Sequence, residues 1–309
     1  MAHLDNIPEI VAPTKQPVFF TLVRSSDDAR SARILIDSLR EYGGQLDHSP
    51  FWVFLSNGQS TPSELKELTD VDFFPVEIGT AHRQYILGDK VYVCAQAEKM
   101  AEARQINTLV WMSAYSLIIK PPDLFKLGTN YDTALRGVHI KNIGSPLDEP
   151  VDPFWQAVYQ KVDLRESALN VISLVDQSSI RPYFNTHLFS IRPDLHLLER
   201  WSDVFYALIT DPEFQNRYCQ DIEHQIFLHQ AVFSALALKV VGWNRIRQLP
   251  ASYSYPLHLH HQVPDPYHSR SLNEQVCPVY EGRFHYPNSL NGLEVYEPLG
   301  SWLSAYVTK

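Results

Sequence analysis

The first strongly apolar stretch of the sequence is Pro17-Val-Phe-Phe-Thr-Leu-Val23. Its β-branched and aromatic residues, bounded by a proline, predict a strand that is buried on both faces. Cap-forming and acidic residues follow at positions 25–28, and an apolar stripe at the spacing of an amphipathic helix comes next: Ala32, Leu35, Ile36 and Leu39. A buried strand that leads directly into such a helix is the unit from which α/β folds are built.

The same alternation of strand and helix continues along the first half of the chain. Residues 51–55 and 71–76 are apolar runs typical of buried strands, and a short helix is expected between them from Thr61. A helix rich in alanine is predicted over residues 90–105, and another buried strand over residues 108–112. This order predicts an α/β fold with a mostly parallel, twisted sheet flanked by helices and joined by right-handed crossovers.

The second half of the chain is expected to extend this sheet. The further elements that the patterns predict are strands at residues 117–119, 131–138 and 184–191, and helices at residues 154–162, 194–208 and 221–239. No linker rich in Pro, Ser or Gly separates the halves. We therefore expect an N-terminal tail (1–16) and two halves (17–145 and 146–309) that pack as one unit, with a terminal segment rich in Tyr, Pro and His.

Composition and charge restrict what the protein binds and where it works. The 309 residues are 45% apolar and 20% charged, which is ordinary for a globular chain. A net charge of −9 is opposite to that of most proteins that bind nucleic acids or anionic membranes. No stretch reaches the roughly 20 apolar residues that span a bilayer, and the first residues lack the pattern of a secretory signal. Three cysteines far apart in sequence suit a reducing compartment, so we expect a cytoplasmic location.

The strongest short catalytic motifs are missing from the sequence. It contains no Gly-x-Gly-x-x-Gly after the first strand, no P-loop, no Gly-x-Ser-x-Gly and no His-Glu-x-x-His. Dinucleotide oxidoreductases, P-loop kinases and α/β-hydrolases are therefore disfavoured. Open α/β sheets bind ligands at the carboxyl ends of their strands, and polar residues occupy two such ends, at positions 24–28 and 113–115.

Several segments occur in an order that resembles glycosyltransferases of the GT-A type, in particular the glycogenin-like ones. Gly88-Asp89-Lys90 opens the alanine-rich helix, and Leu109-Val-Trp-Met-Ser-Ala-Tyr-Ser116 ends the next strand. Phe184-Asn-Thr-His187 is similar to the family's Phe-Asn-Ser/Thr-Gly, and Asp221-x-x-x-Gln225 to its Asp-Gln helix start. The likeness covers residues 17–240. It implies a first half that binds a nucleoside-diphosphate sugar as donor and a second half that binds a hydroxyl acceptor.

The chain departs from this family at the metal-binding motif. In the family, an Asp-x-Asp motif holds a divalent cation, Mn or Mg, which neutralises the diphosphate of the donor. The corresponding positions here are Ser113 and Tyr115, which are uncharged and poor metal ligands. Three accounts fit this departure: phosphates bound without metal by Lys90, beside Asp89, or by an arginine such as Arg24; a metal held elsewhere by histidines; or a site that now serves binding or structure.

The histidine-rich terminal segment has two interpretations. Tyr253-Ser-Tyr-Pro-Leu-His-Leu-His-His261 alternates, so His258 and His260 would share one face of an extended strand. Together with His268 or His285 they could form a site for a transition metal, because imidazole is a good ligand for such ions. The alternative is that they are loop histidines bonded to backbone. The resemblance to GT-A enzymes favours His285, and then His258, as a ligand of a metal and diphosphate.

The remaining candidates also have a functional and a structural interpretation. Asp27 and Asp28 either contact the ribose or base of a nucleotide or favour a helix start through its macrodipole. Asp221 is either a catalytic base or acceptor ligand, or the N-cap of a helix. Asn185 is expected to line a pocket, because a buried amide needs partners, and His187 follows it on the same strand.

The sequence therefore predicts transfer of a sugar from a nucleoside-diphosphate sugar to a hydroxyl acceptor. Asp221, Asn185 and His187 are the candidate catalytic residues. Two other interpretations stay open: a non-catalytic GT-A-like module for binding or assembly, and an enzyme whose histidines hold a transition metal. The sequence does not determine the sugar, the acceptor, retention or inversion, or the oligomeric state.

Overall fold

The protein is described by a computed structural model that covers residues 16–56, 58–166, 168–286, 290 and 292–307. The predicted N-terminal tail (1–16) therefore lies outside the described residues, apart from Gln16. Within the described ranges, no helix is both long and apolar enough to cross a membrane.

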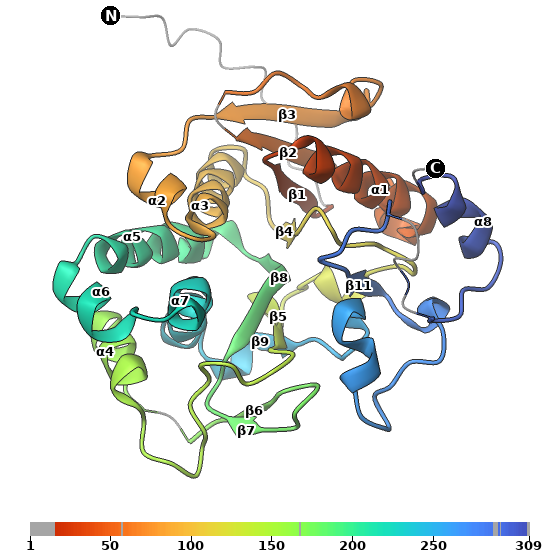
Figure 1. The fold of residues 1–309 in the computed structure, drawn as a ribbon. Coiled ribbons are helices and arrows are strands. Elements are labelled where there is room, and N and C mark those ends of the chain that lie inside the picture. Colours follow the sequence, from red (N-terminus) through yellow and green to blue (C-terminus); the bar gives the residue numbers. More distant parts are fainter. Residues whose placement is uncertain (1–15, 57, 167, 287–289, 291, 308–309) are drawn as a thin grey trace, which may run out of the picture.

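A seven-stranded sheet forms the centre of the molecule (Figure 1). In spatial order its strands are β3 (Val71–Val76), β2 (Phe51–Ser56), β1 (Val18–Val23), β4 (Leu109–Met112), β8 (Phe184–Ile191), β5 (Thr133–Gly137) and β9 (Ile246–Gln248). Neighbours pair in parallel except β8, which runs antiparallel to both β4 and β5. The predicted α/β class with a mostly parallel sheet is confirmed, and β8 and β9 bring strands of the second predicted half into the same sheet.

Helices cover both faces of this sheet, as the crossovers require. They are α1 (Ser26–Tyr42), α2 (Thr80–Gln84), α3 (Gly88–Ala103), α4 (Pro153–Lys161), α5 (Leu197–Ile209), α6 (Pro212–Tyr218), α7 (Ile222–Leu236) and α8 (Leu299–Ser304). Along β1, Phe20 packs into the core under α3, α5 and α7, whereas Phe19 packs into the core under α1. Both rings are fully buried, which explains why this strand is apolar throughout.

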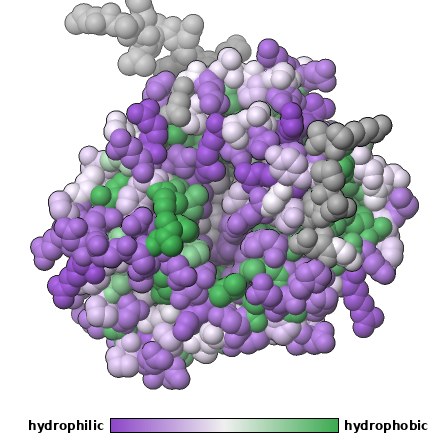
Figure 2. All heavy atoms as spheres, viewed as in Figure 1, coloured by the Kyte–Doolittle hydropathy of each residue, from purple (hydrophilic) through white to green (hydrophobic). Residues whose placement is uncertain are grey.

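The terminal segment builds a small region of its own beside α1. Its strands β10 (Tyr253–Pro256) and β11 (Cys277–Val279) pair in parallel, and α8 closes a third apolar cluster with residues of the same segment. A two-stranded hairpin, β6 (Val171–Ile172) and β7 (Ser179–Ile180), lies below β5 and β9 in the view of Figure 1. The face seen in Figure 2 is mostly hydrophilic, with apolar residues gathered in scattered patches.

Three predicted elements are wrong in detail. Residues 117–119 form no strand; the backbone N–H groups of Leu117 and Ile119 donate to carbonyls of Pro278 and Val276 in the terminal segment instead. The extended run predicted to residue 261 ends at Pro256, because a 3₁₀ turn takes over at residues 257–262. The helix predicted from Thr61 is a single 3₁₀ turn at residues 63–65.

Candidate functional site

The chain leaves β1 at Arg24 and enters α1 almost at once. Ser25 is the N-cap, and its hydroxyl accepts a hydrogen bond from the backbone of Asp28. Asp28 is itself buried, and its carboxylate accepts from the backbone N–H of Arg24 at 3.2 Å. The guanidinium of Arg283, from the terminal segment, pairs with the same carboxylate at 2.8 Å. The Asp28 carboxylate, which the sequence predicts to favour a helix start, thus links the end of β1 to Arg283, 255 positions further along the chain.

The start of α3 lies directly opposite. Asp89 accepts two hydrogen bonds from the guanidinium of Arg24, at 2.5 and 3.3 Å, which is the bidentate geometry that arginine favours. Arg24 is therefore held between two carboxylates, Asp89 and Asp28, the second at 3.9 Å. The sequence prediction grouped these three residues, and the structure brings them together.

Lys90 follows Asp89 and is buried against β8 and α7. Its ammonium group donates to the Thr186 hydroxyl at 2.7 Å and lies 3.0 Å from Nε2 of His229. Nδ1 of His229 is 2.7 Å from the carbonyl of Ile226, so Nδ1 carries the proton and Nε2 accepts. Burial lowers the pKa of Lys90 to about 7, so charged and neutral forms coexist near neutral pH.

The turn after β4 carries the residues that replace the family's Asp-x-Asp. The Tyr115 hydroxyl lies 3.0 Å from Nδ1 of His187, and the guanidinium of Arg283 lies over the Tyr115 ring at 4.8 Å. Burial raises the pKa of Tyr115 to about 12, so the hydroxyl keeps its proton. Burial and neighbouring basic groups hold the pKa of His187 well below its usual range. Both groups are therefore neutral, and Ser113 beside them carries no charge.

Asn185 lies on β8 beside two histidines, His187 of the same strand and His139, which follows β5. Its amide oxygen accepts from the backbone of His187 at 2.6 Å, and its amide nitrogen is 3.4 Å from Nε2 of His139. The rings of His139 and His187 stack with centroids 5.6 Å apart. Glu281, from the terminal segment, is exposed and lies 3.6 Å from Nε2 of His187. The sequence predicts that Asn185 lines a pocket, but it lines neither the pocket at the end of β4 nor the cavity near β5; its buried amide contacts His187 and His139 instead.

Most of the predicted residues form one cluster at the carboxyl ends of β1 and β4. A small pocket there is lined by Leu22, Arg24, Asp28, Leu87, Lys90, Trp111, Ser113, Ala114 and Tyr115. Asp221 is not brought to it. That residue is the N-cap of α7, where its carboxylate accepts from the backbone of His224 and lies 2.8 Å from the imidazole of the same residue.

The residues at the turn after β4 do not fit a divalent cation of the Mn or Mg type. Such ions prefer several oxygen ligands, carboxylates above all. Asp28 and Asp89 are occupied by arginines, and Ser113 and Tyr115 are neutral. Among the residues the structure describes, three metal-ligating side chains converge at one place alone, where Glu102, His196 and Glu199 meet on the surface at α3 and α5. We therefore assign no step to a metal.

The three histidines predicted as metal ligands lie apart from one another. His260 is buried, and its Nδ1 lies 2.9 Å from the Tyr255 hydroxyl. His285 faces Asp27 at 3.7 Å, and the Asp27 carboxylate also accepts from the hydroxyl of Tyr286. His258 packs against His139 with ring centroids 6.4 Å apart. The predicted shared face does not exist, because a 3₁₀ turn replaces the extended strand at these positions.

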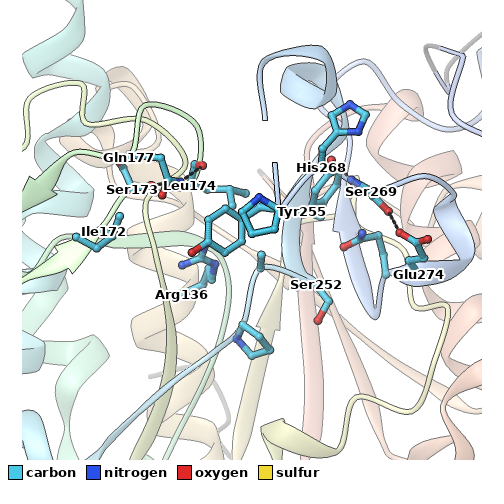
Figure 3. Close-up of a pocket in the computed structure, with 15 residues that line it drawn as sticks. Arg136, Ile172, Ser173, Leu174, Gln177, Ser252, Tyr255, His268, Ser269 and Glu274 are labelled. Carbon is cyan, nitrogen blue, oxygen red and sulfur yellow. Dashed lines mark hydrogen bonds between the residues drawn. The ribbon is translucent and has the colours of Figure 1, made fainter. Parts of the chain in front are cut away.

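A second and much larger hollow lies near β5 and the terminal segment (Figure 3). This cavity of about 530 Å³ is lined by residues of β5, the β6–β7 hairpin and the segment from Pro250 to Gln275. Arg136 lies between the hairpin residues on one side and His268, Ser269 and Glu274 on the other. Large concave sites of this size are where small ligands bind.

Sequence reasoning missed several residues of both regions. Glu281 and Arg283 lie in the same short segment as His285, and their charges beside Gly282 were a usable signal. Arg136 was visible as a charged residue inside a predicted strand. His139 and His229 carried no local signal, because their partners are distant in sequence.

Comparisons with known proteins identify the fold. No family model matches the chain, and no curated protein matches it in sequence. Solved structures superpose on nearly all of it, among them two glycosyltransferases. The galactosyltransferase LgtC, solved with donor and acceptor sugar analogues, has a TM-score of 0.54 at 11% identity, over 94% of this chain and 97% of that one. The bifunctional glycosyltransferase WbbM also has a TM-score of 0.54 at 11% identity, over 95% of this chain and 52% of that one. The chain has a GT-A-type fold.

Proposed function

We propose that this chain, built on a GT-A-type fold, transfers a glycosyl group from a nucleoside-diphosphate sugar to a hydroxyl acceptor. The observation that carries the proposal is the cluster of Arg24, Lys90 and Arg283 around residues 113–115. Open α/β sheets bind their ligands at this edge, the carboxyl ends of the parallel strands. Basic side chains form strong charge-assisted hydrogen bonds with phosphate oxygens, so these three residues suit a diphosphate in place of a metal.

Each of these cations already has a partner in the free protein. Arg24 is bonded to Asp89, Arg283 to Asp28, and Lys90 to neutral groups on β8 and α7. A diphosphate would therefore bind by exchange, taking hydrogen bonds that these carboxylates now accept. A nearby anion raises the pKa of a lysine, so Lys90 would become fully protonated as the donor binds.

The transfer step needs a group that takes the proton of the acceptor hydroxyl. The bond between the sugar and the diphosphate breaks, a bond from the sugar to the acceptor oxygen forms, and the hydroxyl proton is released. We assign that proton to the carboxylate of Glu281, which is exposed beside His187. His187 and Tyr115 are neutral, so their role is to donate and accept hydrogen bonds, and Asn185 orders His187. Asp221 stays a capping residue in this assignment.

A panel of donors tests the proposal. Thermal unfolding is recorded with UDP-, GDP- and ADP-sugars in EDTA, and release of nucleoside diphosphate is followed with the same donors. We expect stabilisation by one class of donor and slow release of its diphosphate. Arg24→Gln should abolish the stabilisation, whereas Arg200→Gln should leave it unchanged, because Arg200 is exposed on α5. Absence of any response across the panel in the wild type would refute the proposal.

A second candidate is a module of the same fold that binds a nucleotide sugar without turnover. The observation that favours it is the small size of the pocket at residues 113–115, combined with cations that are all internally paired. Such a site resists the rearrangement that catalysis needs. Saturable binding of a donor, with no release of diphosphate over hours at any acceptor tested, would select this candidate over the enzyme.

A further inference from the structure

Arg136 lines the cavity at β5 with a guanidinium that has no partner among the described residues. Its side chain makes no hydrogen bond or ion pair within the described part of the chain, although the residue is half-buried. A half-buried charge without a partner costs free energy, so this cation on a cavity wall indicates that an anionic ligand completes the site.

The charge of the cavity is set by few groups. Burial lowers the pKa of Arg136 without neutralising it, because a guanidinium stays protonated in proteins. Glu274 lies across the cavity, but its carboxylate already accepts from the Ser269 hydroxyl at 2.8 Å and from the backbone of Arg270 at 3.0 Å. Tyr267 lines the same cavity and is exposed, but its phenol is neutral near pH 7 and supplies no counter-charge. The guanidinium therefore faces the cavity with its charge unmatched.

We propose that this cavity binds a small anionic saccharide, a hydroxylated ring whose carboxylate or phosphate pairs with Arg136. A planar guanidinium matches both anions in a bidentate way. The polar side chains of Ser252 and Gln177 line the same cavity and are available to the ring hydroxyls. The volume of about 530 Å³ is ample for a single sugar unit with its anion.

The position of the cavity connects it to the candidate site. Arg136 pairs in register with Asn185 across β5 and β8, and its charge acts on His139. His139 stacks on His187, which contacts Tyr115 at the donor end. The ligand of the cavity is thus placed as the acceptor, an identification that rests on the proposed function. The anion site itself does not depend on it.

Binding of three sugars to the full chain tests the inference, with no nucleotide present. Glucuronate and glucose 6-phosphate present the two anions, and glucose is the neutral control of the same ring. Saturation-transfer NMR and calorimetric titration would measure each dissociation constant for the wild type, Arg136→Gln and Arg200→Gln. Arg200 is exposed on α5, so Arg200→Gln removes the same charge at a position outside the cavity. Thermal unfolding confirms that each variant is folded.

We expect at least one of the two anionic sugars to bind at least about tenfold more tightly than glucose. Arg136→Gln should remove that preference, while Arg200→Gln keeps it; the tighter of the two sugars identifies the anion as carboxylate or phosphate. Equal binding of all three sugars, no binding of either anionic sugar, or full retention in Arg136→Gln would overturn the inference. Arg136→Gln should still bind a nucleoside diphosphate, so failure of the anion site and failure of the proposed donor site are seen separately.

Discussion

The two polar regions of this molecule differ in how their charges are matched. At the ends of β1 and β4, Arg24 and Arg283 are bonded to buried or half-buried carboxylates, and Lys90 is bonded to Thr186 and His229. At the β5 cavity, the Arg136 side chain has no such partner among the residues that the structure describes. In the first region the three cations have partners within the protein, whereas in the second the guanidinium of Arg136 faces an open cavity.

This difference separates two uses of arginine. A paired arginine holds elements of the fold together, and Arg283 joins the terminal segment to α1 in this way. An unpaired arginine on a cavity wall is costly for the free protein and gains its partner from outside. To bind a diphosphate, the cations of the donor region must give up their present partners. Arg136 can bind an anion in the cavity without giving up a partner. Three stability measurements would break or sharpen this contrast.

The largest effect is expected from Asp28→Ala. Its carboxylate is buried, and removing it leaves the guanidinium of Arg283 without its partner, which costs about 3 kcal/mol of unfolding free energy. Asp27→Ala removes the neighbouring carboxylate, which is partly exposed; its loss should cost much less, because solvent screens its ion pair. Urea unfolding of both variants measures the difference. Similar small losses for the two would show that the paired cluster does not hold the terminal segment.

A smaller contrast is expected between two arginines outside the donor region. Arg181 is buried and donates to the Ser145 hydroxyl and the Glu149 carbonyl, besides its ion pair with Glu166. Arg181→Leu should therefore lower the unfolding free energy by about 2 kcal/mol. Arg136→Leu breaks no such bond and should change the unfolding free energy by less than about 1 kcal/mol, in either direction. A loss at Arg136 as large as that at Arg181 would mean that Arg136 is paired in solution.

The sequence anticipated the first region better than the second, for a physical reason. Strands, helix caps and the order of segments are local patterns, so β1, α1, α3 and β4 and the residues at their ends could be predicted. The contacts between these elements could not be predicted, because Arg283 lies 255 positions from Asp28 in the sequence and His229 lies 139 positions from Lys90. The shared face predicted for His258 and His260 is wrong for a local reason, because a 3₁₀ turn after Pro256 replaces the extended strand that would align their side chains.

The smallest of the three effects depends on pH and concerns Lys90. Its pKa is lowered to about 7 in the folded protein, below that of an unfolded lysine, so between these values the unfolded chain binds the extra proton. The stability of the wild type relative to Lys90→Met should therefore rise with pH above about 7, by up to roughly 1.4 kcal/mol per unit. Urea unfolding of both proteins at pH 7.5 and 8.5 measures it. A pH-independent difference would mean that Lys90 is an ordinary charged lysine.

The most direct test of the account is calorimetric titration of a nucleoside diphosphate into the protein at pH 8, in EDTA and in two buffers of different ionisation enthalpy. The phosphates are already deprotonated at this pH, so a proton taken up on binding belongs to the protein. We expect saturable binding with uptake approaching one proton, because the anion raises the pKa of Lys90, and we expect Lys90→Met to lose both the uptake and most of the affinity. Binding that appears with Mn²⁺ alone, or that is unchanged in Lys90→Met, would contradict a donor site built from this chain's own cations.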